Sequence, residues 1–315
     1  MLRLPDHWVW DSWLAIDGEH YHLFFLRASR ALLDPHRRHR RAAIGHAVST
    51  DLRSWELLPD ALVHADRPAW DEEAVWTGSV VRAPDGRWYM FYTGVTWRAG
   101  MALQRIGLAV STDLISWHRV GSGPLLSADP RWYECVDAES GASEAWRDPY
   151  VFADPDGDGW HMLLTASVPV RDSRWRGVIG HARSPDLRHW EACPPLTRPA
   201  GFGELEVPQV HDVDGRAVLV FSCLPEQMAP ARRPATLAGT WTVLGGAKVT
   251  DGWDVASAMP MPHPSLYTGR LLRDVDGGWC LLGFRHTEHG TFHGEILDPV
   301  PVTMVDGRLT PRTVS

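Results

Sequence analysis

Apolar and polar residues alternate in short runs along the whole chain, and most of these runs meet at an Asp-Gly pair. Such a pair precedes an alternating run at Asp17, Asp85 and Asp158, with weaker copies at Asp214 and Asp276. Asp-Gly between alternating runs indicates a β-hairpin, because glycine tolerates the positive φ that a tight turn requires. No stretch shows the 3.6-residue period of an amphipathic helix. The pattern therefore predicts an all-β protein assembled from hairpins.

A second repeat follows the first three hairpins. Residues 44–56 read Ile-Gly-His-Ala-Val-Ser-Thr-Asp-Leu-Arg-Ser-Trp-Glu, and close copies stand at 106–118 and 179–191. We interpret its first half as a third strand and its Ser-x-Asp-Leu-x-x-Trp tail as a polar turn into a fourth. With this second repeat, the five Asp-Gly hairpins, about one per 60–70 residues, predict a five-bladed β-propeller of four-stranded antiparallel blades around a central funnel.

The repeats also predict where each blade lies. The expected blades are 5–60, 70–120, 143–195, 203–246 and 257–312, which makes residues 1–315 a single propeller domain. Two longer segments, 119–142 and 224–238, are rich in Gly, Pro and polar residues, and we expect them to form loops at the rim, where specificity usually resides.

Three acidic residues occupy one phase of the repeat, six to eight positions before an Asp-Gly pair, at Asp17, Asp156 and Asp214. They are Asp11, Asp148 and Glu206, and Trp76 lies near the same phase in the second blade. Equal phase in equal blades predicts that these side chains converge on one end of the funnel. An acid inside an apolar strand needs a partner or a function. The turn acids named above, and the repeated acids Asp51, Asp113 and Asp186, are instead interpreted as structural.

Converging carboxylates suit glycoside cleavage, in which one is ionised and another donates a proton to the leaving oxygen. Arg147 precedes Asp148 and is a candidate for keeping a carboxylate ionised, although adjacent strand residues point to opposite faces. It is expected either to reach around the strand edge or to bind substrate. Glu204 lies two residues before Glu206 and has three open roles: to bind sugar hydroxyls, to tune Glu206, or to be the acid itself.

Composition and charge further narrow the class of protein and its expected partners. A net charge of −8 argues against a nucleic-acid partner, and we interpret the basic run at 36–41 as a solvated loop. No apolar run is long enough for a membrane span, and the N-terminus lacks a signal-peptide pattern, so a cytoplasmic location is expected. The four cysteines match no zinc spacing, and His286, His289 and His293 are interpreted as scattered surface residues. We therefore expect no metal and no cofactor.

At these residues the sequence resembles the five-bladed propeller glycosidases of glycoside hydrolase families 32 and 68, the invertases, fructanases and levansucrases, and more distantly family 43. Four motifs carry the resemblance, in family order: Val9-Trp10-Asp11-Ser12-Trp13, Trp76-Thr77-Gly78-Ser79, Arg147-Asp148-Pro149 and Glu204-Leu-Glu206-Val-Pro. The resemblance implies a nucleophilic Asp11, a transition-state stabiliser at Asp148 and an acid/base at Glu206. The sequence departs from the family pattern at Val207, where Cys or Arg is usual. It is also expected to lack the C-terminal β-sandwich of family 32.

The resemblance further implies a retaining enzyme acting on a β-fructofuranoside such as sucrose or a short fructan, by hydrolysis or by transfer to another sugar. The expected substrate-binding residues are Trp10, Trp76, Thr77, Ser79, Arg147, Glu204 and Tyr267. Two alternatives stay open from the sequence. One is an inverting arabinofuranosidase or xylosidase like those of family 43, and the other is a carbohydrate-binding propeller without catalysis. In each case the expected partner is a small sugar or an oligosaccharide.

Overall fold

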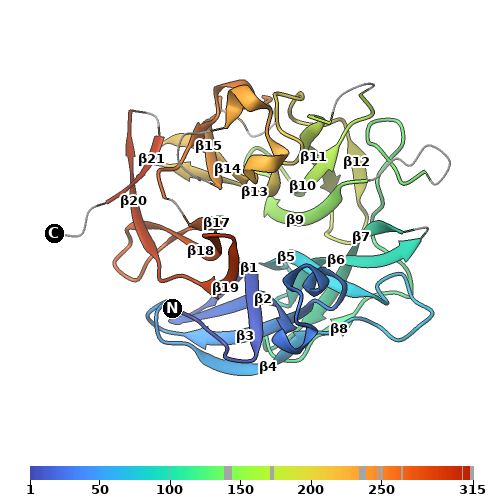
Figure 1. The fold of residues 1–315 in the computed structure, drawn as a ribbon. Coiled ribbons are helices and arrows are strands. Elements are labelled where there is room, and N and C mark those ends of the chain that lie inside the picture. The colour runs from blue at the N-terminus through green and yellow to red at the C-terminus, as the bar shows by residue number, and fades with distance from the viewer. Residues whose placement is uncertain are drawn as a thin grey trace.

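The structure, a computed structural model, describes residues 1–98, 100–137, 144–170, 174–233, 239–246, 248, 251–263, 265–306 and 308–312. Five antiparallel sheets form a ring, and the innermost strands surround its centre (Figure 1). The predicted five-bladed β-propeller is confirmed.

The blades follow one another in chain order, each from its innermost strand outward. Blade one has β1 (His7–Asp17), β2 (His20–Ser29), β3 (Ala43–Ser49) and β4 (Glu56–Leu62). Blade two has β5 (Ala74–Arg82), β6 (Trp88–Arg98), β7 (Met101–Ser111) and β8 (His118–Arg119). Blade three has β9 (Trp146–Ala153), β10 (Trp160–Ser167), β11 (Gly177–Ser184) and β12 (Glu191–Cys193). Blade four has β13 (Glu206–Val213), β14 (Arg216–Ser222), β15 (Thr240–Leu244) and β16 (Met259–Pro260). Blade five has β17 (Leu266–Arg273), β18 (Trp279–Glu288), β19 (Thr291–Ile296), β20 (Val300–Val305) and β21 (Arg308–Pro311).

Two details of the blade layout differ from the prediction. The outer strand of blade four is β16, at 259–260, which the repeat pattern had assigned to blade five. Blade five contains an additional strand, β19, which pairs with β18 beside the main path of the sheet. Neither strand carries the Ile-Gly-x-Ala or Asp-Leu-x-x-Trp signature, so the sequence repeat held no signal for them. Of the two predicted rim loops, residues 138–142 and 234–238 lie outside the described residues.

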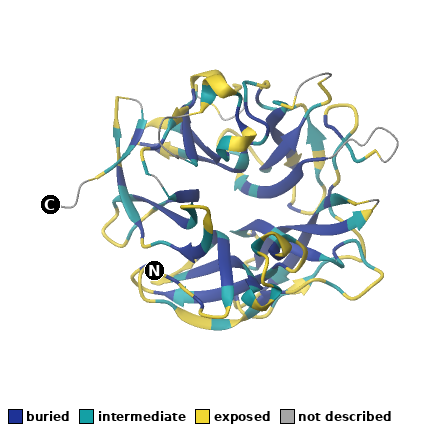
Figure 2. Ribbon diagram, viewed as in Figure 1, coloured by how far each residue is buried: buried dark blue, intermediate teal, exposed yellow. Residues whose placement is uncertain are grey.

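The hydrophobic core lies between neighbouring blades rather than inside any one of them. Each pair of adjacent sheets buries the apolar side chains of its facing surfaces. In Figure 2 the inner strands are coloured mostly as buried. The ring is closed by the N-terminal segment, where Leu2 exchanges two backbone hydrogen bonds with Ile296 of β19, at 2.9 and 3.0 Å. This contact joins the last blade to the start of the first.

Local chemistry explains the turns within the blades. In the three Ser-x-Asp-Leu repeats, the aspartate accepts the backbone N–H groups of the residues two and three positions after it, and the leucine that directly follows it is buried with φ between 61° and 67°. The structural role predicted for Asp51, Asp113 and Asp186 is therefore confirmed. In blades three, four and five the side chains that accept hydrogen bonds from the hairpin turn are Asp154, Asp212 and Asp274, not the predicted Asp158, Asp214 and Asp276.

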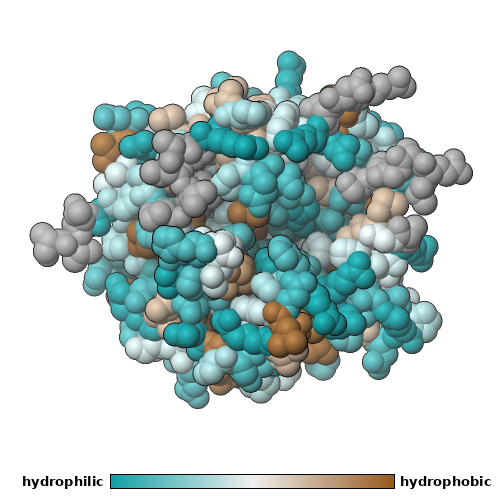
Figure 3. Space-filling model, viewed as in Figure 1, coloured by the Kyte–Doolittle hydropathy of each residue, from teal (hydrophilic) through white to brown (hydrophobic). Residues whose placement is uncertain are grey.

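Helical structure is limited in the described residues to five short 3₁₀ segments. They are η1 (Arg30–Leu32), η2 (Pro35–Arg40), η3 (Pro225–Gln227), η4 (Pro230–Arg232) and η5 (Val255–Ser257). None of these helices has the length and apolar character needed to cross a bilayer. The face viewed in Figure 3 is largely hydrophilic and is hollowed near its centre, above the ring of innermost strands.

Candidate active site

Every innermost strand carries a β-bulge at the same height. The pairing register shifts at Asp11 in β1, at Thr77 in β5 and after Arg147, Glu206 and Tyr267 in β9, β13 and β17. A bulge adds a residue to one strand and re-aims its side chains. Two consecutive side chains of one strand can therefore face the funnel, which strict alternation would forbid.

Hydroxyl groups of the preceding blade hold three of these bulges in place. Thr93 of blade two accepts the backbone N–H of Asp148 at 3.0 Å, and Thr165 of blade three accepts that of Val207 at 3.2 Å. Ser222 of blade four accepts the N–H of Thr268 at 3.0 Å. The three bulge residues have φ of 58°, 53° and 46°, a conformation that costs energy for non-glycine residues. These hydrogen bonds satisfy the buried amides that the bulges release from the ladder.

A cavity of about 330 Å³ opens at this height, and it brings the predicted site residues together. Nine of the ten predicted residues line it: Trp10, Asp11, Trp76, Thr77, Arg147, Asp148, Glu204, Glu206 and Tyr267. The tenth, Ser79, lies instead between blades two and three, where its buried hydroxyl accepts the backbone N–H of Val151 at 3.1 Å. Ser79 therefore supports the blade contact and does not line the predicted sugar subsite.

Asp11 lies in the bulge of blade one with φ of 28°. Its Oδ2 accepts a hydrogen bond from the Thr77 hydroxyl of blade two at 2.6 Å. Burial and the nearby charge of Asp148 raise the pKa of Asp11 to about 7, while the Thr77 hydroxyl opposes that rise. This carboxylate is therefore held where it changes charge near neutral pH.

Asp148 is fixed more tightly than Asp11. Its Oδ2 accepts hydrogen bonds from Thr165 at 2.7 Å and from the Val207 amide at 3.3 Å, and Arg147 Nε lies 3.5 Å away. Burial raises the pKa of Asp148, while Arg147, Thr165 and the Val207 amide act in the opposite direction. All three contacts converge on Oδ2, so within the described parts of the chain Oδ1 is left available to a ligand.

Arg147 connects the acidic residues of blades three and four. Its guanidinium contacts Asp148, Glu204 at 2.9 Å and Glu206 at 2.7 Å, with only 10% of its side chain exposed. Burial alone would lower the pKa of Arg147, but the three carboxylates raise it well above its usual value. Arg147 does not reach around the strand edge, because the bulge turns both Arg147 and Asp148 toward the cavity. Its predicted role in substrate binding stays a prediction.

The register corrects the predicted phase of Glu206. The bulge residue of blade four is Val207, so Glu206 corresponds to Arg147, Trp10, Trp76 and Tyr267 rather than to Asp11 and Asp148. Glu206 nevertheless faces the same cavity, because residues just before the bulge line it as well. Tyr267 of blade five donates its hydroxyl hydrogen to Glu206 Oε2, while Arg147 donates to Oε1.

Glu204 lies before the start of β13 and shares Arg147 with Glu206. Burial raises the pKa of Glu204, and the charge of Glu206 adds to that rise against the effect of Arg147. Glu204 is thus a second carboxyl group at the side of the cavity, distinct from the Tyr267–Glu206 pair.

Part of the cavity wall was not predicted from the sequence, and the interpretation of the basic run at 36–41 as a solvated loop is wrong for part of it. The segment folds as η2, in which Arg37 is exposed but Arg38 is buried and lines the cavity with His39. Arg38 lies over the rings of Phe292 and Trp10, at 3.9 and 5.4 Å, and its Nε has no hydrogen-bond partner among the described residues. Burial lowers the pKa of Arg38 to about 10, against the effect of Asp11 and Glu206.

Two neutral imidazoles complete this wall. Burial and the charge of Arg38 lower the pKa of His39 to about 3 and that of His286 to about 4. His286 lines the cavity, so the prediction that it is a surface residue is wrong. Across the described chain, no three His, Cys, Asp or Glu side chains come together as a metal site.

Arg270 supports the site from a buried position and was not among the residues predicted from the sequence. From β17 it donates to the backbone carbonyls of Ser12 at 2.9 Å and Gly78 at 3.1 Å, so it joins blade five to blades one and two. Burial lowers its pKa, while Asp148 and Asp11 are among the groups that act against that. The only sequence signal was a charged residue inside the apolar strand Leu266–Arg273.

Fold and cavity together define the class: a five-bladed β-propeller whose carboxylates, from three different blades, line one axial funnel. Residues 9–246, about three quarters of the chain, match the model of the glycosyl hydrolases family 32 N-terminal domain. The chain belongs to this family.

Comparisons with individual proteins agree with this membership. An acid β-fructofuranosidase from a Rosa hybrid cultivar is 41% identical over 127 residues, which are 39% of this chain and 20% of that protein. A β-fructofuranosidase from Zea mays is 39% identical over 89 residues, 27% of this chain and 13% of that protein. The chain thus matches well under two thirds of the length of these relatives.

Solved structures share the fold over nearly the whole chain. An inulosucrase from Halalkalicoccus jeotgali bound to kestose has a TM-score of 0.77 at 23% identity, covering 98% of this chain and 89% of that one. A levansucrase from Gluconacetobacter diazotrophicus has a TM-score of 0.78 at 18% identity, covering 99% and 82%. At these identities the likeness concerns the fold alone.

Proposed function

We propose that this protein is a retaining glycosidase that cleaves a β-fructofuranoside such as sucrose or a short fructan. The observation that carries the proposal is the meeting of Asp11, Asp148 and Glu206, from three blades, in the funnel of a family 32 propeller. The β-fructofuranosidases among its relatives support the choice of sugar.

In this proposal Asp11 attacks the anomeric carbon while Glu206 gives a proton to the glycosidic oxygen, and the leaving sugar departs. The product of this step is a fructosyl group bound covalently to Asp11. Glu206, now ionised, takes a proton from water, the water attacks the anomeric carbon, and the Asp11 carboxylate leaves. When the hydroxyl of another sugar replaces water, the same step gives transfer.

The surroundings of the three acids support these roles. Asp148 has its Oδ2 occupied by Thr165 and the Val207 amide, which leaves Oδ1 for sugar hydroxyls on the fructosyl unit. Glu206 accepts hydrogen bonds from Arg147 and Tyr267. It lies on blade four, whereas Asp11 lies on blade one. The indoles of Trp10 and Trp76 line the cavity beside Asp11, and they offer apolar surface to the sugar ring.

Product analysis tests the proposal. The wild type and the Asp11→Asn variant are incubated with sucrose, a short fructan and an aryl arabinofuranoside, and the products are separated by chromatography. Fructose released by the wild type, with kcat lowered by more than roughly 10³-fold in the folded variant, is the expected result. Release of arabinose, or sugar binding without any turnover, would contradict the proposal and favour one of the two alternatives.

A further inference from the structure

Arg270 of β17 is a buried arginine placed directly behind the acids of the funnel. It is 5% exposed and does not line the cavity. Its guanidinium crosses from blade five to the backbone carbonyls of Ser12 and Gly78, at 2.9 and 3.1 Å. These two residues directly follow Asp11 and Thr77 in the chain. Arg270 therefore holds the backbone of blades one and two just behind that pair.

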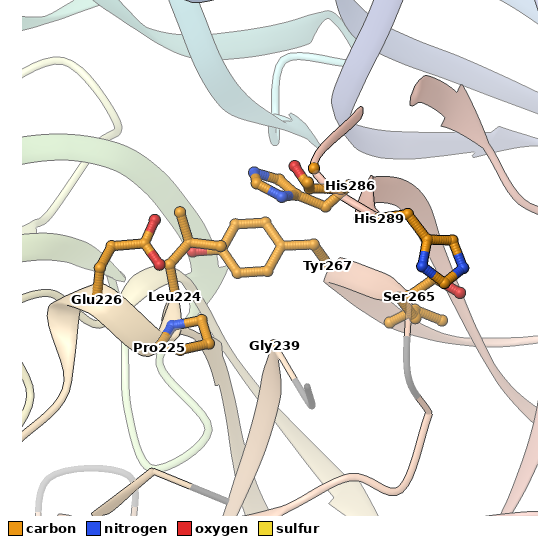
Figure 4. A pocket seen from close by; sticks show the side chains of 11 residues that line it. Leu224, Pro225, Glu226, Gly239, Ser265, Tyr267, His286 and His289 are labelled. Carbon is orange, nitrogen blue, oxygen red and sulfur yellow. The ribbon is translucent and has the colours of Figure 1, made fainter. Parts of the chain in front are cut away.

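The bulge of β17 explains how one strand supplies both Tyr267 and Arg270. The pairing register of β17 shifts between these two residues. Tyr267 precedes the shift and donates its hydroxyl hydrogen to Glu206 in the cavity, and Figure 4 shows its ring extending from β17 toward Leu224. Arg270 follows the shift and points instead to the inner strands of blades one and two.

Gln209 of β13 fixes the strand on both sides of Arg270. Its Nε2 donates to the carbonyl of Gly269 at 2.7 Å, and its Oε1 accepts the N–H of Leu271 at 2.9 Å. Gln209 is itself buried, so both ends of its amide serve the contact between blades four and five. Because the residues before and after Arg270 are held in this way, the guanidinium has a defined reach toward blades one and two.

The two carbonyls that Arg270 holds control a hydrogen bond in the funnel. Thr77 of blade two donates its hydroxyl hydrogen to Asp11 Oδ2 of blade one at 2.6 Å. Each partner lies in a bulge, and Arg270 binds the residue that follows each bulge. A guanidinium presents its N–H groups in a rigid planar fork. Bonding both carbonyls therefore fixes the two bulges relative to each other.

The charge of Arg270 acts on the funnel acids at longer range, because both of its direct partners are neutral carbonyls. Burial lowers the pKa of Arg270, while Tyr150, Asp148 and Asp11 act in the opposite direction. Burial raises the pKa of Asp148, and Arg270 is among the groups that oppose this rise. On β13, burial and Arg270 lower the pKa of His211 to about 4, so this neighbour is neutral at pH 7.

Charge balance at the funnel also involves Arg270. The cavity is lined by four carboxyl groups and two guanidinium groups, those of Asp11, Asp148, Glu204, Glu206, Arg38 and Arg147. Neighbouring carboxylates oppose each other's ionisation, and burial together with the charge of Asp148 raises the pKa of Asp11 to about 7. When Glu206 carries the proton that it donates, the three remaining carboxylates match three guanidinium groups only if Arg270 is included.

We infer that Arg270 is a positioning residue of this active site, which holds Asp11 and Thr77 in register from behind and keeps Asp11 and Asp148 ionised at the same time. The inference rests on the proposed function, in which Asp11 must be ionised to attack and Asp148 to accept sugar hydroxyls. Arg270 acts through these acids rather than on the substrate, because it lies outside the cavity.

The test measures the pH dependence of kcat/KM on one fructoside in charged and neutral variants of Arg270. Arg270→Gln keeps N–H donors but removes the charge. The acidic limb of its profile is expected to move to higher pH by about 1 unit, and its kcat at the optimum to fall roughly tenfold. Arg270→Lys keeps the charge and the wild-type limb, but its kcat falls as well, because an ammonium group lacks the fork that holds two carbonyls.

Two further variants separate this role from a purely structural one. Arg119→Met is the matched control, because Arg119 pairs with Asp71 at 2.8 Å and does not line the cavity. Its Tm is expected to fall while its acidic limb stays in place. Arg270→Met is a second neutral variant in case Arg270→Gln folds poorly, since an apolar side chain leaves no unpaired polar group behind. A folded neutral variant with the wild-type acidic limb and only a lower Tm would overturn the inference.

Carboxyl ¹³C NMR distinguishes a failure of this inference from a failure of the proposed function. The protein is labelled at the aspartate Cγ, and the signals of Asp11 and Asp148 are assigned from the Asp11→Asn and Asp148→Asn variants. Titration of these carboxyl groups at higher pH in Arg270→Gln than in the wild type supports the inference even if no fructoside is cleaved. Equal titration midpoints in the two proteins contradict it, whatever their activity.

Discussion

Tyr267 of blade five donates its hydroxyl hydrogen to Glu206 of blade four, whose other oxygen accepts a hydrogen bond from Arg147 of blade three. Three blades thus fix one carboxyl group. Each of the two donors holds one carboxylate oxygen, so the orientation of Glu206 depends on side chains far from it in sequence.

Removal of the tyrosine hydroxyl is expected to impair proton transfer. In Tyr267→Phe, Glu206 loses one of its two anchors, and kcat on a sugar leaving group falls by roughly 10–100-fold. An aryl fructoside with a good leaving group needs less protonation, so its kcat falls by a much smaller factor. Tyr150→Phe is the control, because the Tyr150 hydroxyl donates to the Val210 carbonyl outside the cavity. An equal loss on both substrates would count against the role of Tyr267.

The hydroxyl of Thr77 sets the charge state of Asp11. Because it donates to Asp11 and opposes the rise of that pKa, Thr77→Val is expected to raise the pKa above its value of about 7. The acidic limb of the kcat/KM profile then moves to higher pH by roughly 0.5–1 unit, since a net hydrogen bond is worth about 1 kcal/mol. Thr77→Ser keeps the donor and the wild-type limb. If the acidic limb of the kcat/KM profile lies at the same pH in Thr77→Val and Thr77→Ser, the Thr77 hydroxyl does not set the pKa of Asp11.

Arg38 is expected to bind substrate. Its guanidinium lies in the cavity wall with an unbonded Nε in the described structure, and Arg38→Met is expected to raise KM by about tenfold with a smaller change in kcat. Arg37→Met is the control, because Arg37 belongs to the same 3₁₀ helix and is exposed. Steady-state kinetics on one fructoside distinguish the two variants, and equal KM values would show that Arg38 does not contact the sugar.

The ionised form of Asp11 is expected to destabilise the fold. The folded pKa of about 7 lies above the usual 3.8, so the free energy of unfolding falls as pH rises between these two values and stays low above them. Asp11→Asn removes the charge. Its Tm is therefore expected to exceed that of the wild type by several degrees at pH 8, with the difference shrinking toward pH 4. A wild type that is the more stable protein at pH 8 would contradict this.

Buried histidine pairs make blades one and three sensitive to acid. His22 Nδ1 lies 2.9 Å from His46 Nε2, and His161 and His181 repeat this contact in blade three. Burial lowers the pKa of His22 and lowers that of His46 to about 3. Since unfolded histidine titrates near 6.5, stability is present above that pH and is lost as pH falls toward the folded values.

Blade two shows how this sensitivity can be removed. In blade one, His22 pairs with Val48 and His46 pairs with Phe24. The equivalent residues of blade two are Tyr89, which pairs with Val110, and Leu108, which pairs with Phe91. The double substitution His22→Tyr and His46→Leu copies that arrangement, and its Tm is expected to fall less than that of the wild type between pH 7 and pH 4.5. His20→Tyr, at an exposed position, is the control. Parallel Tm curves for the double variant and the wild type would refute the role of the pair.

Much of the fold was predictable because its signals are local. The Asp-Gly turns depend on glycine at positive φ, and the Ser-x-Asp-Leu turns depend on a carboxylate bonded to the next backbone amides, so each is encoded within a few residues. Repetition of these signals predicted five blades, and blade equivalence predicted that Asp11, Asp148 and Glu206 face one funnel. The outer strand of blade four and the additional strand of blade five carry no such signal and were not predicted.

Only the tertiary structure decided how the funnel is built. The bulges that turn Arg147 and Glu206 inward are held by hydroxyls of the preceding blades, so no single strand sequence contains the information. Arg38 enters the wall because Phe292 and Trp10, far apart in the chain, offer their ring faces, whereas its neighbour Arg37 stays in solvent. The repeat, the turns and the blade that carries each acid follow from local signals in the sequence. Contacts between blades, which depend on ring closure, determined the direction and charge of each side chain.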